Sequence, residues 1–318
     1  MLENGYIKHV CGDHDFKPQA LFYRFMEDEP DRGHTEESES WHSMLATLKD
    51  KGSIAPKDLG AVLGNSSDFV QKNDPDHLPH MLFDEHNCDL YDAVHPIKWV
   101  DPNTEGKYDM LVIGGGAGGL VTAAGSAGVG AKVAIIERNF LGGDCLNNGC
   151  VPSKAFLKCA NVINSARTAS QYGIEITGEI KCNFKKVMDR MRKIRAEISE
   201  NDSANRFSKA LGVDVYMGNA KFTGKNSVEI NGKTLTFLKA CIATGGRPAK
   251  PNIFGIENVP HFTSDNIWNL NTQPKNMVIV GAGPIGAELG QAFQRLGTQV
   301  TFICRGPNFL PREDRDAA

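Results

Sequence analysis

The sequence predicts an α/β fold, and two observations lead to this expectation. Apolar segments at residues 110–113 and 277–280 each run directly into a glycine-rich turn, and a stretch rich in small residues follows each turn. A short apolar segment is typical of a buried parallel strand, and the turn after it is typical of a connection to a closely packed helix. We therefore expect two strand–turn–helix units, one within residues 107–272 and a second, incomplete one within residues 273–318.

Charge is distributed unevenly along the 318 residues, although the formal net charge is only −3. Residues 1–106 carry 9 Lys+Arg against 21 Asp+Glu, whereas residues 107–318 carry 26 against 17. The basic part could attract a phosphate-bearing cofactor, but it lacks the dense Lys/Arg blocks that indicate nucleic-acid binding. We expect no nucleic-acid partner.

Residues 1–106 read as an acidic extension, partly disordered, with short helices within 41–63 and an irregular wrap or linker over 64–106. His77 and His80 resemble a zinc-ligand pair, but a proline between them breaks the helical spacing, and no metal site is predicted. The N-terminus has no apolar signal sequence, and the eight cysteines lack the density of a secreted disulfide framework. A reducing intracellular compartment, cytoplasmic or organellar, is expected.

The first glycine turn has the spacing of a dinucleotide-binding loop. Residues 110–131 carry no charge, which would suit a membrane helix, but eight of these 22 residues are glycine. Gly114, Gly116 and Gly119 instead supply the tight turn, the close approach to a pyrophosphate and the close helix packing of a Rossmann-type site. Glu137 ends the next apolar segment, 23 residues after Gly114, where a carboxylate can bind ribose hydroxyls. No membrane span is expected.

A second turn repeats this spacing with Gly281, Gly283 and Gly286. Here the position 23 residues after the first glycine is Cys304 rather than an acid, and Arg305 follows it. The loss of a ribose-binding carboxylate and the gain of a cation favour a 2′-phosphate, which predicts NADP(H) rather than NAD(H) at this second site. Two dinucleotide sites in one chain indicate a bound electron carrier that is reduced and then reoxidised.

Between the two turns, Cys145 and Cys150 stand five residues apart in the string GGDCLNNGCVPSK. A pair this close beside a dinucleotide site can form a disulfide that opens and closes during turnover. We expect both residues at the start of a helix, where the N-terminus lowers the pKa of a thiol. Lys154 follows Cys150 by one helical turn, so its charge could stabilise a thiolate.

Four motifs in this order resemble one family. They are GGGAGG, GGDCLNNGCVPSK, CIATGGRP and GAGPIGAELG, and together they span roughly residues 107–316. The chain is thereby identified as similar to the class I pyridine nucleotide-disulfide oxidoreductases. The resemblance implies that residues 107–272 form an FAD-binding domain with a redox disulfide, and that residues 273–318 begin an NAD(P)-binding domain.

The resemblance also implies residue roles. Hydride would pass from NADPH through FAD to the Cys145–Cys150 disulfide, with Cys150 next to the flavin and Cys145 facing a disulfide or a soft metal ion such as Hg(II). Glu288 would pair with Lys154 on the flavin side. The residues implied in FAD contact are Gly114, Gly116, Gly119, Glu137, Gly143, Asp144, Lys154, Ala220, Thr244 and Gly245.

Residues 151–154 and 305–314 resemble mercuric reductase in particular. Asp144 replaces the usual threonine, which adds a negative charge near the pyrophosphate, and Pro284 replaces a tyrosine that covers the nicotinamide site in glutathione reductase. Only 42 residues follow Asn276, and they provide two of the three strands that a mononucleotide-binding half needs.

We therefore expect a chain truncated at its C-terminus, with two strands whose apolar faces lack neighbours. In the full-length form the resemblance implies a homodimer. Two alternatives stay open: a non-catalytic flavin-binding remnant, and a dihydrolipoamide dehydrogenase, which would prefer NADH.

Overall fold

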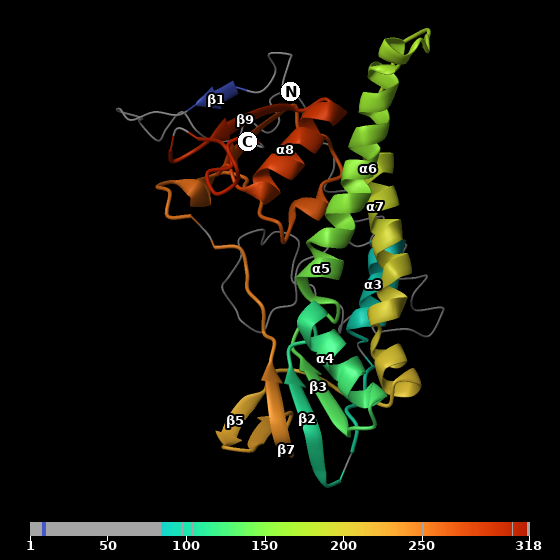
Figure 1. The fold of residues 1–318 in the computed structure, drawn as a ribbon, viewed down its shortest axis with the longest axis vertical. Coiled ribbons are helices and arrows are strands. Elements are labelled where there is room, and N and C mark those ends of the chain that lie inside the picture. Colours follow the sequence, from blue (N-terminus) through green and yellow to red (C-terminus); the bar gives the residue numbers. More distant parts are fainter. Residues whose placement is uncertain are drawn as a thin grey trace.

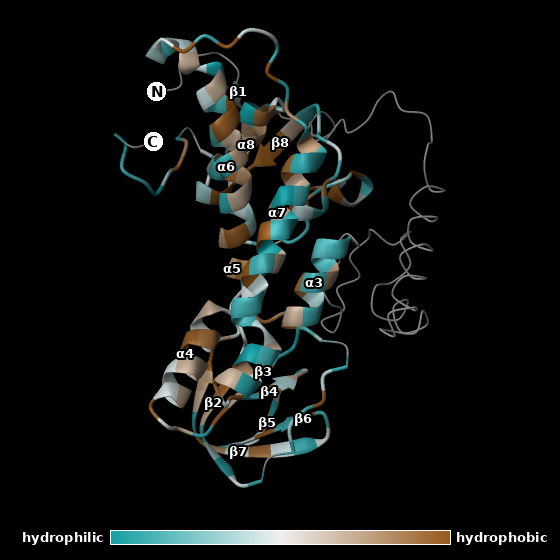
Figure 2. Ribbon diagram, turned by 90° about the vertical axis from the view of Figure 1, so that its right-hand side faces the viewer, coloured by the Kyte–Doolittle hydropathy of each residue, from teal (hydrophilic) through white to brown (hydrophobic). Residues whose placement is uncertain are grey.

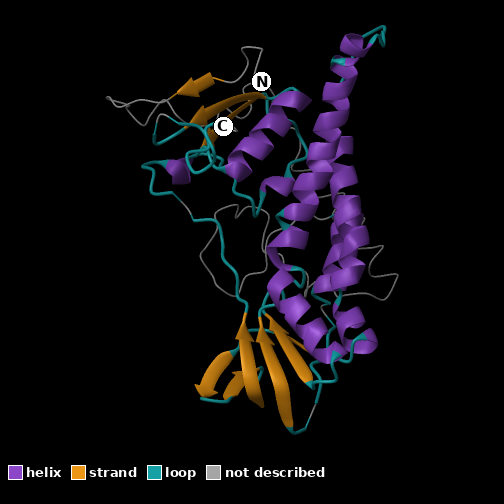
Figure 3. Ribbon diagram, viewed as in Figure 1, coloured by secondary structure: helices purple, strands orange, loops and turns teal. Residues whose placement is uncertain are grey.

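The computed structural model describes residues 8–10, 84–96, 98–103, 105–249, 251–306 and 308–316. Two sheets lie at opposite ends of the molecule, and the longest helices run between them (Figures 1 and 3). The helices of these residues are α3 (Glu85–Val94), α4 (Ala117–Gly128), α5 (Gly143–Asn147), α6 (Cys150–Arg167), α7 (Phe184–Ser199) and α8 (Pro284–Leu296). The strands are β1 (Lys8–Val10), β2 (Lys107–Ile113), β3 (Val133–Glu137), β4 (Asp214–Met217), β5 (Lys221–Gly224), β6 (Ser227–Ile230), β7 (Lys233–Ile242), β8 (Asn276–Val280) and β9 (Gln299–Ile303).

The larger sheet has the strand order β4-β3-β2-β7-β6-β5. Its first four strands are mutually parallel, and β5 and β6 are antiparallel additions at one edge. The chain leaves β2 toward β3 on one side, whereas β7 pairs with β2 on the other side. This reversal at β2 opens a crevice at the carboxyl ends of the strands, which is where doubly wound α/β sheets bind ligands. The predicted α/β fold with a Rossmann-type first domain is confirmed.

Burial on both faces explains the apolar strands of this sheet. All five residues of β3 are buried, and Leu111 and Val112 in β2 are fully buried. Val112 packs into the cluster under α3 and α4, whereas Leu111 packs with Tyr108 and with residues of β6 and β7 on the opposite face. The charge-free stretch 110–131 is thus a strand, a turn and a helix, as expected, and α4 carries many of the hydrophobic residues coloured brown in Figure 2.

The antiparallel edge contains a tight hairpin between β6 and β7. Asn231 and Gly232 form its turn with φ angles of 48° and 75°. Two successive positive φ values are those of a type I′ turn, whose twist matches that of the strands it joins. The strands pair from Ile230↔Lys233 outward to Ser227↔Thr236, as an Asn-Gly pair between alternating residues predicts.

The second unit is larger than the sequence predicted. β8 and β9 pair in parallel, and β1 from the N-terminal end adds a third parallel strand beside β9. The expectation that both strands lack apolar neighbours is wrong for one face. Met277, Val300 and Phe302 are buried in one apolar cluster with residues of α8, and α6 and α7 contribute to the same cluster, with α6 packed along α8.

The expected irregular linker over residues 64–106 is wrong at α3. Asp84 begins this helix by accepting a hydrogen bond from the backbone N–H of Asn87 at 2.8 Å. Leu90 and Val94 are fully buried, and α3 packs along α7 (Figure 2). Packing against the first unit therefore stabilises α3, which could not be predicted from its polar sequence.

The remaining expectations for the extension, short helices within 41–63 and no metal site at His77 and His80, lie outside the described residues. In the part of the chain that the structure describes, no helix combines the length and apolar character needed to cross a bilayer.

Candidate functional site

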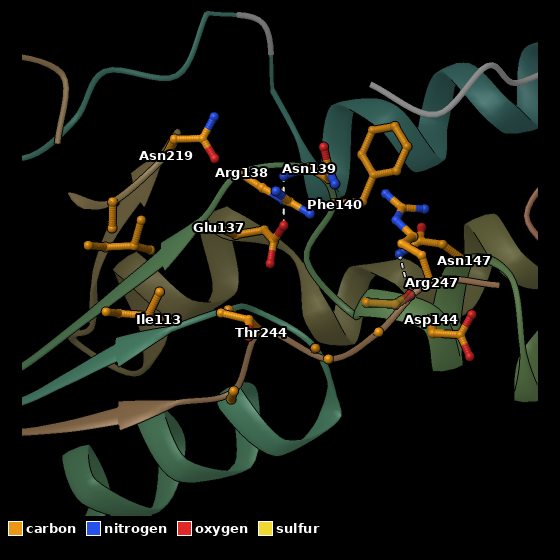
Figure 4. Close-up of a pocket in the computed structure, with 18 of the residues that line it drawn as sticks. Ile113, Glu137, Arg138, Asn139, Phe140, Asp144, Asn147, Asn219, Thr244 and Arg247 are labelled. Carbon is orange, nitrogen blue, oxygen red and sulfur yellow. Dashed lines mark hydrogen bonds between the residues drawn. The ribbon is translucent and has the colours of Figure 1, made fainter. Parts of the chain in front are cut away.

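A cavity of about 560 Å³ lies at the carboxyl end of the larger sheet, where β2, β3 and β7 end (Figure 4). Ile113, Glu137 and Ala243 reach it from the ends of these strands or directly after them. Eight of the residues expected to contact a first cofactor line this one cavity: Gly114, Gly116, Glu137, Gly143, Asp144, Ala220, Thr244 and Gly245. Gly119 and Lys154 are not among its lining residues.

Two glycine contacts leave the cavity floor without side chains. A β-carbon added to Gly119 would lie 1.8 Å from the carbonyl oxygen of Gly114, so α4 reaches the turn only because residue 119 is glycine. Gly143 has a φ of 54°, and a β-carbon on it would lie 2.5 Å from the Cα of Gly116. The loop before α5 is therefore pressed against the first glycine turn, and both present bare backbone to the cavity.

Glu137 is 8% exposed and is held in place by two backbone donors. Its Oε2 accepts a hydrogen bond from Gly115 N at 2.6 Å, and its Oε1 accepts one from Asn139 N at 2.6 Å (Figure 4). A carboxylate has about four acceptor positions, so these two bonds orient it and leave acceptor capacity for ligand hydroxyls. This is the arrangement expected of a ribose-binding acid.

Asn147 contributes an unsatisfied acceptor to the cavity wall. Its Nδ2 donates to Leu141 O at 3.0 Å and to Gly143 O at 2.8 Å. Its buried Oδ1 has no hydrogen-bond partner among the described residues, and the side chain lies on the cavity wall (Figure 4). An orphaned buried acceptor costs free energy until a ligand donor reaches it. With the glycine cradle and Glu137, this group fits a dinucleotide such as the FAD implied by the sequence.

Asp144 stands at a charged end of the same cavity, beside Asp265 and Arg247. Arg247 Nη1 lies 3.3 Å from Asp265 Oδ2, and Asn148 Nδ2 donates to Asp265 Oδ1 at 3.2 Å. Burial, and then the charge of Asp265, raise the pKa of Asp144, while Arg247 opposes the rise. The nearby charges that act on Asp144 are therefore those of this Arg–Asp pair.

The two cysteines of the expected redox couple lie on neighbouring helices. Cys145 is in the first turn of α5, Cys150 is the first residue of α6, and both are free thiols in this structure. Neither lines the cavity, but Asp144 and Asn147 on either side of Cys145 do. The dithiol and the cavity are thus parts of one local structure.

The expected lowering of the thiol pKa by a helix N-terminus is wrong for Cys145. A side-chain hydrogen bond to Cys150, followed by burial and the charges of Cys150 and Asp202, raises the pKa of Cys145 to about 11. A backbone hydrogen bond with Cys150 acts in the opposite direction and is outweighed. The hydrogen bond to the adjacent thiol is the largest cause of this rise in pKa.

Lys154 and Glu288 form the ion pair that the family resemblance implied. Lys154 Nζ, on the first turns of α6, lies 2.5 Å from Glu288 Oε1 on α8. The side chains are 64% and 36% exposed, so the pair lies at the surface. It joins the cysteine-bearing helix to the helix that follows the second glycine turn.

The second glycine turn has the expected shape. Gly281 has a φ of 107°, Gly283 precedes the first residue of α8, and a β-carbon on Gly286 would lie 3.0 Å from the Gly281 carbonyl oxygen. Pro284 occupies the first helical position, where its missing N–H costs nothing. Arg305 lies two residues beyond β9 and is exposed. Its role toward a 2′-phosphate remains a prediction.

Several site residues had not been singled out from the sequence. Asn147 and Arg247 belong to motifs quoted from the sequence, so attention to every polar position there would have found them. Asn139 lies two residues after Glu137, so its place at the cavity follows from that of Glu137, whereas Asp265 had no local signal because only the fold brings it to the cavity. Among the described residues, no group of three or more His, Cys, Asp or Glu side chains could hold a metal ion.

The fold and this cavity define a dinucleotide-binding α/β protein with an adjacent dithiol. The chain belongs to the pyridine nucleotide-disulphide oxidoreductase family, whose family model matches residues 108–318. This is a family of FAD-dependent pyridine nucleotide oxidoreductases.

Similar proteins in the family carry different names. The chain is 36% identical to a dihydrolipoyl dehydrogenase of Acholeplasma laidlawii, covering 66% of this chain and 63% of that protein. It is 35% identical to a mercuric reductase of Lysinibacillus sphaericus, covering 66% and 38%, and 36% identical to a glutathione reductase of Nostoc sp., covering 66% and 44%. Among solved structures, the HOCl-induced flavoprotein disulfide reductase RclA from Escherichia coli matches with a TM-score of 0.56 and 29% identity, covering 66% of this chain and 45% of that chain. The chain thus spans between 38% and 63% of the length of these three sequence relatives.

Proposed function

We propose that this chain binds FAD in the cavity at the end of β2 and uses Cys145 and Cys150 as the redox couple of an NADPH-dependent disulfide oxidoreductase. One observation carries the proposal. The segment that bears Cys145 also forms a cavity wall, because Gly143, Asp144 and Asn147 all line it. A cofactor held by this wall would bind next to the dithiol.

The chain's own residues would hold the cofactor as follows. The bare backbone at Gly114, Gly116 and Gly143 would receive the pyrophosphate, and Glu137 would accept hydrogen bonds from ribose hydroxyls. Asn147 Oδ1 would accept from a ligand donor. When bound, FAD supplies two-electron transfer between a reduced nicotinamide and a disulfide.

The dithiol would then perform thiol–disulfide exchange. Cys145, which the family resemblance assigns to the substrate, attacks a substrate disulfide, forms a mixed disulfide and passes its proton to the first substrate sulfur, which leaves as a thiol. Cys150 then attacks the Cys145 sulfur, releases the second substrate thiol and leaves the Cys145–Cys150 disulfide. The substrate gains two electrons and two protons, and the couple loses the same number.

Lys154 and Glu288 would act beside this couple. A lysine one turn after Cys150 places a positive charge near the sulfur, and Glu288 holds that lysine through its 2.5 Å contact. We assign Lys154 to the electrostatic stabilisation of a thiolate or of a reduced cofactor. Glu288 is its positioning residue.

The second glycine turn would receive the pyridine nucleotide, with Arg305 favouring the 2′-phosphate of NADPH. The electron acceptor would be a small-molecule disulfide or a soft metal ion such as Hg(II), which a pair of thiolates binds well. The names of the relatives include dihydrolipoyl dehydrogenase, mercuric reductase and glutathione reductase, which act on different acceptors. Lipoamide with NADH is therefore the alternative.

A second candidate, a flavin-binding protein without turnover, is favoured by the raised pKa of Cys145, because a protonated thiol is a poor nucleophile. One experiment separates the candidates. The FAD-loaded chain is mixed anaerobically with NADPH or NADH, and flavin bleaching is followed with glutathione disulfide, lipoamide or Hg(II) as acceptor. Bleaching by NADPH and recovery on adding an acceptor supports the enzyme. Bound flavin that neither nucleotide bleaches supports the binding protein and contradicts the enzyme.

A further inference from the structure

We propose that residues 84–96 and 98–103, which precede the region matched by the family model, are a structural part of the cofactor site. They brace three of its walls from outside, and His95 is the positioning residue for the wall formed by residues 138–141. The inference rests on the proposed FAD site, and it concerns a segment to which neither the family match nor the sequence motifs assign a role.

The first brace acts on the loop between Glu137 and Gly142. Val94 O accepts a hydrogen bond from Leu141 N at 3.1 Å, and His95 Nδ1 hydrogen-bonds the carbonyl oxygen of Asn139. Because a carbonyl can only accept, Nδ1 carries the proton in this bond. Asn139 lines the cavity, so the imidazole holds the outer side of a cavity wall.

Aromatic rings fill the space behind the same wall. Phe140 lines the cavity and is 4% exposed. The ring centroids of Tyr91 and His95 lie 5.4 Å and 6.0 Å from that of Phe140, and both pairs are edge-to-face. This geometry is favourable for aromatic pairs, and it limits movement of Phe140 away from the cavity.

The second brace reaches Asn147 through a buried arginine. Arg195 on α7 is 1% exposed, and its Nη2 donates to Asn87 Oδ1 on α3 at 2.5 Å. Its Nη1 donates to the backbone carbonyl of Asn147 at 2.7 Å. The side chain of Asn147 carries the orphaned acceptor of the cavity, so α3 helps to fix the position of that acceptor.

The third brace supports the cavity wall that follows β4. Trp99 Nε1 donates to Val215 O at 2.9 Å, and Asp101 Oδ1 accepts from Met217 N at 3.1 Å. Residues 218–220 follow directly and line the cavity. Lys233 Nζ in turn donates to the carbonyl oxygen of Pro102 at 2.9 Å, which ties this brace to β7.

A site binds its ligand tightly when contacts behind the lining residues hold them in the binding geometry before the ligand binds. On its inner side, the loop at residues 138–141 forms hydrogen bonds with Glu137 and Gly143. On its outer side, it forms hydrogen bonds with the end of α3 and with His95. Removal of the imidazole leaves the Asn139 carbonyl without this partner. The loop is then expected to open more often and to bind FAD more weakly.

The test compares His95→Ala with two matched variants of the full chain. His95→Asn keeps an N–H donor near the position of Nδ1. His86→Ala removes a histidine from α3 that forms no hydrogen bond with the cavity loops in the described part of the chain. Amide hydrogen exchange of the 138–142 segment is measured without cofactor, and FAD binding is measured by flavin fluorescence. The first readout needs no bound FAD.

In His95→Ala we expect faster exchange confined to residues 138–142 and a dissociation constant for FAD about fivefold to tenfold higher, the change that loss of one net hydrogen bond produces. His95→Asn should restore both values, and His86→Ala should leave them unchanged. Exchange and FAD affinity of His95→Ala within twofold of the wild type overturn the inference. If wild-type protein binds no FAD, the proposed function fails, and the exchange measurement alone decides the brace.

Should His95→Ala not fold, the third brace gives a second test. Asp101→Ala removes the acceptor for Met217 N. We expect faster exchange confined to residues 217–220 and weaker FAD binding, and unchanged values for both overturn the inference.

Discussion

Lys154 Nζ lies 2.5 Å from Glu288 Oε1, so the helix that begins at Cys150 is tied to the helix behind the second glycine turn. Both side chains are partly exposed, and exposed ion pairs contribute between zero and about 1 kcal/mol. We predict that Glu288→Gln lowers the free energy of unfolding of the cofactor-free protein by less than ~1 kcal/mol. Urea denaturation measures this change.

The same variant should slow flavin reduction in the loaded protein, because Lys154 loses the group that positions it. Glu197→Gln is the matched control, since Glu197 forms a 3.9 Å surface pair with Lys193 that has no link to the site. Equal reduction rates in Glu288→Gln and Glu197→Gln would show that the Lys154–Glu288 pair has no role beyond stability.

Two neighbouring glycines of α4 should respond in opposite ways to alanine. A β-carbon at Gly119 would meet the Gly114 carbonyl oxygen at 1.8 Å, whereas one at Gly118 has no atom within 4 Å. Gly119→Ala must separate α4 from the turn, and we expect it to abolish FAD binding. Gly118→Ala should keep binding and gain up to about 1 kcal/mol of stability from helix propensity.

Thermal unfolding and flavin titration of the two variants provide the measurement. FAD affinity in Gly119→Ala equal to that in Gly118→Ala would contradict the assignment of this turn to the cofactor.

The interaction between Cys145 and Cys150 predicts a reactivity that can be measured without cofactor. The hydrogen bond to Cys150, burial and nearby charge raise the pKa of Cys145 to about 11, so at pH 8 this thiol is almost fully protonated. Because the thiolate is the nucleophile, alkylation of Cys145 by iodoacetamide should be slow at pH 8 and should increase with pH up to that value.

Cys150→Ala removes both the hydrogen bond and the charge of Cys150, so it should speed labelling of Cys145 at pH 8. Peptide mass spectrometry of timed samples reports the rate. Cys182→Ala serves as the control, because Cys182 is not among the groups that shift the pKa of Cys145. Unchanged labelling of Cys145 in Cys150→Ala would mean that the two thiols do not interact.

The ion pair between Asp84 and Arg192 should be costly to break. Arg192 Nε lies 2.5 Å from Asp84 Oδ2, without hydrogen-bond alignment, and the Arg192 side chain is 2% exposed. Asp84→Asn keeps a good helix-capping side chain and removes only the charge. We predict a loss of about 3 kcal/mol in unfolding free energy, because the buried guanidinium loses its nearest carboxylate and keeps only the more distant, exposed Asp189 at 3.8 Å.

Asp89→Asn is the control, since Asp89 is an exposed acid on the same helix. A cost below about 1 kcal/mol for Asp84→Asn, within the range of surface pairs, would show that α3 is not held by this charge.

Most of the strands could be predicted because their signals are local. Apolar segments that end in glycine turns identify β2 and β8, and an Asn-Gly pair identifies the β6–β7 hairpin. The helix α3 could not be predicted in this way, because its buried Leu90 and Val94 are interspersed with polar residues and its main stabilising contacts come from α7.

The candidate site divides in the same manner. The glycine turn and Glu137 could be predicted from their spacing in the sequence, because each of these positions must meet one geometric requirement of the binding site. Asp265 and His95 reach the site through tertiary packing, and no neighbour in the sequence indicates their role. The pKa of Cys145 was predicted in the wrong direction because the rule for helix termini does not include a second thiol at hydrogen-bonding distance.

His95 should also give the protein a pH dependence of stability. Burial lowers the pKa of His95 from its usual value of 6.5, although the bond to Asn139 and the charge of Glu137 oppose the change. The unfolded chain therefore binds a proton near pH 6.5 that the folded protein binds only at lower pH. As pH falls below 6.5, the free energy of unfolding should fall, by at most ~1.4 kcal/mol per pH unit for this one group.

Urea denaturation at several pH values, in the wild type and in His95→Asn, isolates this contribution. Asp92, Asp144 and Asp202 have raised pKa values and act in the opposite direction, but they are present in both proteins. The difference in stability between the two proteins should be constant above pH 7 and should change below 6.5. A difference independent of pH would contradict the burial of a neutral imidazole at this position.

Whether bound FAD and the Cys145–Cys150 couple form one redox unit is measured most directly by the visible spectrum of the FAD-loaded chain during anaerobic two-electron reduction, together with a thiol count. We expect a new long-wavelength absorbance band and two additional reactive thiols, with the band retained in Cys145→Ser and lost in Cys150→Ser. Bleaching of the flavin with no new band and no change in thiol count would contradict this expectation.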